Sequence, residues 1–219
     1  MLKFTSLKKT QSNQLKINMN NLSTNEAKKK ANKVAVRFVV LLIGLYFLFS
    51  QGNLFMNSVM SVDGRFYNAY IAEHFNYIQW IKSSLIIPGT WIIKLFGFYA
   101  IYNEMDVLVI NGPHLRVSYS CIGLGVMSFF TAFVIAFPAK LKSKIKLLII
   151  GTLMIYVLNV LRIAGLGVLL GFFKSQRDNF TYHHEVFNII VYLCIFALLY
   201  FWIKKNTTTV KPKIDIPIE

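Results

Sequence analysis

The clearest pattern along the chain is a series of long apolar runs separated by short polar or basic segments. Runs of about 20 apolar residues can cross the hydrocarbon core of a bilayer as helices. A long polar segment precedes the first run and no small-x-small cleavage site follows it, so we interpret this run as a retained membrane anchor. The pattern predicts four transmembrane helices, at about 34–50, 122–138, 147–172 and 186–203.

A further apolar stretch, at about 84–101, is interrupted by Pro88, Gly89 and Lys94. Its length and charge are marginal for a membrane-crossing helix. Three placements fit it: in the interface, re-entering the membrane, or as an extra span.

Residues 105–120 alternate between apolar and polar positions on either side of Asn111-Gly112-Pro113. Asn-Gly between two such segments is typical of a β-hairpin. We therefore expect a short extended hairpin on the outer face, just ahead of the next span.

The composition agrees with a membrane protein. Of the 219 residues, 55% are apolar and 15% are charged, whereas soluble domains carry about 25% charged residues. The predicted fold class is an all-α integral membrane protein, a bundle of about four transmembrane helices, or five if 84–101 also crosses. Residues 34–203 form the membrane-embedded domain, between a disordered basic tail at 1–33 and a second tail at 204–219.

The net charge of +15 is concentrated in three segments: 1–37, 139–146 and 203–219. Four spans place all three on one side, which the positive-inside rule identifies as cytoplasmic. Both termini are then cytoplasmic, and the near-neutral segments 51–120 and 173–185 face outward. This topological explanation of the charge argues against nucleic-acid binding.

Polar residues enter the apolar part of the chain at one predicted depth. Asn159 and Arg162 share a helical face in the outer part of the third span. Cys121 begins the span that enters from outside, where the helix dipole favours a thiolate. His183 and His184 immediately precede the last span.

Each of these residues also has an ordinary interpretation: a snorkelling arginine, a small buried cysteine, a surface histidine. Their shared depth favours chemistry. A thiol, an imidazole and a guanidinium suit acyl transfer, with nucleophile, proton carrier and oxyanion stabiliser. Gly167 and Gly171, by contrast, indicate helix packing.

At these residues the sequence resembles the exosortase/archaeosortase family of membrane transpeptidases. The matching motifs are Tyr119-Ser120-Cys121-Ile122-Gly123, Asn159-Val160-Leu161-Arg162 and His183-His184-Glu185-Val186-Phe187-Asn188. Ile122 replaces the small residue usual after the cysteine. Asn188 stands where the family often has glycine four residues after its histidine, which favours His184 over His183.

The resemblance implies a catalytic set of Cys121 as nucleophile, Arg162 for the oxyanion and His184 as general acid/base. Supporting candidates are His183, Asn159, Asn188 and Gly123, and neither a metal nor a cofactor is implied. The implied substrates are exported proteins ending in a short motif, a membrane helix and a basic tail. The resemblance also implies that cleavage forms a thioester, which an amine, lipid or glycan acceptor resolves on the outer face of the bacterial inner membrane.

Two other classes of function use some of the same residues. A non-enzymatic membrane subunit could use Arg162 to bind an anionic lipid or glycan carrier, because basic residues between spans hold phosphate head groups. Such a protein would not need Cys121. A thiol oxidoreductase fits poorly, because Cys194 lies well inside the last span, away from Cys121.

Overall fold

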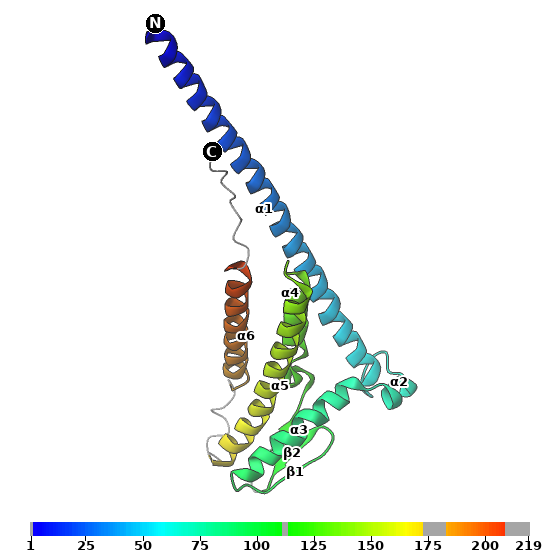
Figure 1. Ribbon diagram of the computed structural model, residues 1–219. Helices are drawn as coiled ribbons and strands as arrows, with labels where there is room; N and C mark the ends of the chain where they lie inside the picture. The colour runs from blue at the N-terminus through cyan, green and yellow to red at the C-terminus, as the bar shows by residue number, and fades with distance from the viewer. Residues whose placement is uncertain (1, 111–113, 173–182, 209–219) are drawn as a thin grey trace.

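The computed structural model describes residues 2–110, 114–172 and 183–208. Figure 1 shows long helices running side by side, with a small sheet and two shorter helices at the end opposite the N-terminus. The elements are α1 Leu2–Met60, α2 Ala69–His74, α3 Tyr77–Leu95, β1 Ala100–Tyr102, β2 Asp106–Val109, β3 His114–Arg116, the 3₁₀ helix η1 Tyr119–Ile122, α4 Leu124–Ala136, α5 Leu141–Phe172 and α6 His183–Thr208.

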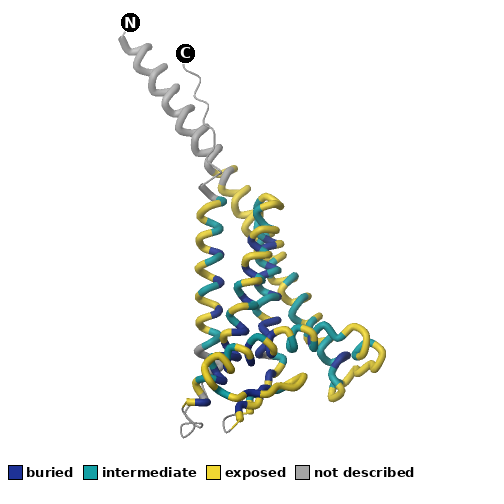
Figure 2. Tube along the Cα trace, turned by 60° about the horizontal axis from the view of Figure 1, so that its bottom comes forward, coloured by how far each residue is buried: buried dark blue, intermediate teal, exposed yellow. Residues whose placement is uncertain are grey.

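Three of the described helices are long and apolar enough to cross a membrane: Lys28–Met60 of α1, Leu141–Leu169 of α5 and Phe187–Asn206 of α6. They confirm the predicted class, an all-α multi-pass membrane protein. Figure 2 shows that many positions along these helices are exposed, while buried positions gather toward the sheet. Exposed apolar side chains on the spans are those that lipid would contact.

The predicted span at 122–138 is shorter than expected. α4 has 13 residues, about 20 Å of helix at 1.5 Å per residue, against a hydrocarbon core about 30 Å thick. It starts only after Gly123, which has a φ of 76°. It stops at Ala136 because Phe137 precedes Pro138 and is extended, with a ψ of 132°.

Residues 1–33, which we expected to be disordered, are helical from Leu2 onward. This prediction was wrong because it considered the segment alone. The segment contains neither glycine nor proline, and it continues a helix already nucleated by the apolar run, so each added residue avoids the cost of starting a new helix.

The interrupted stretch at 84–101 divides into the later part of α3 and strand β1. α3 is not among the candidate spans and packs along α5. Close approach depends on glycines: a Cβ at Gly89 would lie 2.9 Å from Ile163 Cγ2, and one at Gly167 would lie 2.8 Å from Ile93 Cγ1. The packing role predicted for Gly167 is therefore confirmed.

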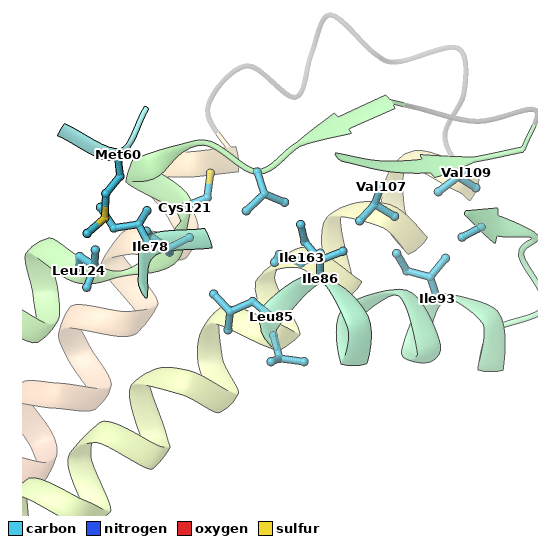
Figure 3. Packing of buried hydrophobic residues seen from close by; sticks show 14 residues of the cluster. Met60, Ile78, Leu85, Ile86, Ile93, Val107, Val109, Cys121, Leu124 and Ile163 are labelled. Atoms are coloured by element: carbon cyan, nitrogen blue, oxygen red, sulfur yellow. The ribbon is translucent and has the colours of Figure 1, made fainter. Parts of the chain in front are cut away.

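The predicted hairpin is present as β2 and β3, and its turn, 111–113, lies outside the described residues. An unpredicted strand, β1, pairs with β2, giving an antiparallel sheet of order β1-β2-β3. Val107 and Val109 are buried on the face of the sheet that packs against the helices (Figure 3).

The described parts of the three basic segments, 2–37, 139–146 and 203–208, lie toward one end of the bundle, opposite the sheet (Figure 1). At that end Lys144 Nζ donates a hydrogen bond of 2.8 Å to the Ile135 carbonyl in the last turn of α4. Trp202 of α6 donates to Ser143 of α5 over 2.9 Å. The side of the membrane on which these segments lie stays a prediction.

Candidate active site

Cys121 lies in η1, at the junction between the sheet and α4 (Figure 3). Its side chain is buried, and its sulfur lies 3.3 Å from Ser118 Oγ, a contact in which either atom can donate. The Cys121 amide donates to the Ser118 carbonyl over 2.9 Å. The 3₁₀ turn therefore folds the serine hydroxyl back onto the thiol.

Gly123 follows the Cys121 turn in the chain and packs against α5. Its positive φ suits the sharp change from η1 into α4, a conformation that side chains disfavour. A Cβ at this position would collide with Asn159 Nδ2 and lie 3.2 Å from Asn159 Cγ. Gly123 and Asn159, both supporting candidates, are thus in direct proximity.

Asn159 and Arg162 are both buried on α5, each 3% exposed. Asn159 Nδ2 donates to the Ile155 carbonyl over 2.8 Å, and Arg162 Nη1 donates to Asn188 Oδ1 on α6 over 3.2 Å. A buried cation needs such polar partners to offset its lost hydration. The Asn188 amide oxygen supplies one such partner from the neighbouring helix.

His183 and His184 occupy the first two positions of α6, and their side chains lie outside the described residues. The helix nevertheless places residues four apart on one face. Position 184 is four residues before Asn188, whereas position 183 is five residues before it. The backbone therefore puts position 184, and not 183, on the Arg162 side of α6.

These contacts join the sequence-selected residues in two groups. Cys121, Gly123 and Asn159 link η1 to α5, and Arg162 with Asn188 links α5 to α6. Asn159 and Arg162 are one helical turn apart, so the two groups meet on α5. Cys194 lies near the middle of α6, is half-buried and, like Cys121, is a free thiol.

Two cavities border the segment that carries Cys121. The residues before it, Ser118 and Tyr119, line a polar cavity of about 750 Å³ beside α1, α2 and α3. The residues after it, Ile122 and Leu124, line an apolar cavity of about 460 Å³ that reaches Asn159 between α3, α4 and α5.

Ionisable groups of the polar cavity are perturbed by burial. Burial, followed by the nearby Tyr77, raises the pKa of Tyr119, so this phenol stays neutral at physiological pH. Burial and then the Arg116 cation lower the pKa of Lys82, while Asp106 opposes that shift. The cavity therefore combines the neutral Tyr119 phenol with basic side chains, Lys82 and Arg116, and with three carboxylates, Asp63, Glu73 and Glu104.

Ser118 was not predicted as a site residue. Its position three residues before Cys121 is a signal only once the chain between them is known to form a 3₁₀ turn, because that turn brings residues three apart together. The extended segment expected there would have kept them apart.

The fold and this site define a class: a multi-pass helical membrane protein with a cysteine, an arginine and a histidine-bearing helix start near one end of its bundle. The family model for transmembrane exosortase matches residues 33–201. The chain belongs to the transmembrane exosortase family, whose general role is that of a membrane transpeptidase. No curated protein and no solved structure matches the chain.

Proposed function

We propose that this protein is a cysteine transpeptidase that cleaves a C-terminal sorting signal from exported proteins and transfers the new C-terminus to an acceptor. The main support is that the residues just before Cys121 line a polar cavity and the residues just after it line an apolar one. A sorting signal also changes from polar to apolar, where its motif ends and its membrane helix begins.

The proposed reaction begins with attack of the Cys121 thiolate on the scissile carbonyl, forming a C–S bond. Arg162, oriented by Asn188, stabilises the oxyanion, and His184 carries the thiol proton to the leaving amine nitrogen as the C–N bond breaks. The resulting thioester is then attacked by an amine, lipid or glycan acceptor, and the thiol is regenerated. No metal or cofactor takes part.

The proposed setting is the inner membrane of a bacterium, with both termini in the cytoplasm and the Cys121 end outside. A substrate helix with a basic tail would insert in the same sense, with its tail inside and its motif outside. The partners are therefore exported proteins and the lipid bilayer, with no role for nucleic acid.

The decisive experiment is thioester trapping in membranes that contain the full-length protein. The probe is an epitope-tagged exported protein of the same genome that ends in a motif, an apolar helix and a basic tail. Wild type should form an adduct that neutral hydroxylamine releases, Cys121→Ala should form none, and the matched Cys194→Ser should behave as wild type. In the same assay His184→Ala should lower the adduct yield more than His183→Ala.

Processing by Cys121→Ala would refute the mechanism. That result would favour the alternative function, a non-enzymatic subunit that binds an anionic lipid or glycan carrier through Arg162.

A further inference from the structure

Strand β3 is an edge strand that leads directly to Cys121. In the described part of the sheet, β3 pairs with β2 alone. Only the short link from Val117 to Ser118 separates β3 from η1, and Figure 3 shows the strand running toward Cys121. An open strand edge therefore ends at the proposed nucleophile.

The register shows which backbone groups point to that edge. The Val117 amide donates to the Met105 carbonyl over 2.9 Å, and Leu115 stands opposite Val107. Along an antiparallel strand, residues alternate between bonding to the partner and pointing away from it. His114 and Arg116 therefore direct their N–H and C=O groups away from β2, and both residues are exposed.

We propose that the extended segment preceding the scissile bond of the substrate binds along this edge as a fourth strand. Strand addition is a common mode of peptide recognition, in which backbone hydrogen bonds supply affinity. The proposal rests on the proposed function, because it takes Cys121 as the point of cleavage.

The direction of the added strand follows from the membrane. After Cys121 the chain enters the bundle as α4, and a sorting signal likewise runs from its motif into its apolar helix. Both chains approach Cys121 with the same polarity, so the added strand is parallel to β3. Three extended steps of about 3.3 Å and two 3₁₀ steps of about 2.0 Å separate Arg116 from Cys121. The residue opposite Arg116 should thus lie about four positions before the scissile bond.

Disulfide trapping tests this placement. The protein carries Cys121→Ala and Cys194→Ser with one new cysteine, and the tagged reporter carries single cysteines at successive positions before its cleavage site. Arg116→Cys should cross-link most strongly about four positions upstream and weakly at the positions on either side of it. Tyr102→Cys, on the opposite edge strand β1, is the matched control and should not cross-link.

A backbone substitution gives the second measurement. Arg116→Pro removes an outward amide, which an edge strand tolerates, whereas Arg116→Ala keeps it. The proline variant should have a kcat/KM about fivefold below that of the alanine variant, the loss expected for one hydrogen bond. Tyr102→Pro, which removes an outward amide from β1, should process the reporter as wild type does.

The outcomes separate this inference from the proposed function. Equal kcat/KM for Arg116→Pro and Arg116→Ala, or cross-linking at Glu73→Cys in the polar cavity instead of at Arg116→Cys, would overturn strand addition while thioester formation stands. Cross-linking along β3 without a thioester in wild type would instead retain the edge as a binding site and remove the catalytic proposal.

Discussion

Arg162 is a buried cation whose guanidinium is oriented by the Asn188 amide. Arg162→Lys keeps the charge but loses the planar fork of donors. If the guanidinium holds an oxyanion, the rate of reporter cleavage should fall by about 10²–10³ with the melting temperature little changed. Arg37→Lys, the same change at an exposed position of α1, should have no effect. Full activity in Arg162→Lys would show that only the charge matters.

At the residue scale, short motifs on helices were the most predictable part of the site. Asn159 and Arg162 share a face by helical spacing alone, and the structure finds both buried there. Neither the Ser118 contact nor the collision of a Gly123 Cβ with Asn159 could be predicted. Each depends on a non-repeating turn between the sheet and α4, where sequence periodicity carries no information.

At the element scale, α4 and α5 meet where the Phe130 ring lies over Gly151. A Cβ at residue 151 would lie 2.8 Å from Phe130 Cε2, and Phe130 is fully buried. Gly151→Ala should therefore destabilise the protein by about 1–3 kcal/mol through overpacking, measured as a lower melting temperature in detergent. Gly125→Ala on α4, where a Cβ meets nothing within 4 Å, should be neutral or slightly stabilising. Equal melting temperatures for the two variants would contradict this view of the interface.

The elements themselves were predicted where local signals were strong. Alternation around Asn-Gly identified the strands of the hairpin, β2 and β3, and apolar length identified α1, α5 and α6 as spans. β1 was missed because its three residues lie at the end of an apolar stretch and become a strand only by pairing with β2. The extent of α1 was missed because its polar half extends a helix that the apolar half nucleates.

At the scale of the whole molecule, the described parts of the basic segments and the sheet lie at opposite ends of the bundle (Figure 1). In a background without native cysteines (Cys121→Ala, Cys194→Ser), Arg65→Cys should react with an impermeant thiol reagent applied from outside. Lys142→Cys, between α4 and α5, should react only after the membrane is permeabilised. Labelling of Lys142→Cys from outside would reverse the topology and place the Cys121 end in the cytoplasm.

The short α4 has a consequence for the surrounding lipid. α4 packs between α1 and α5, and its roughly 20 Å leave about 10 Å of the hydrocarbon core unmatched. Hydrophobic mismatch of this kind is relieved by local thinning of the bilayer. A substrate transmembrane helix of ordinary length would then be about two turns longer than the thinned hydrocarbon core. Unwinding the outer turns of the substrate helix would remove this excess length. We therefore expect bilayer thinning to favour an extended, cleavable segment at the outer end of the substrate helix. Lipids that change the thickness of the bilayer should then change the rate of substrate processing.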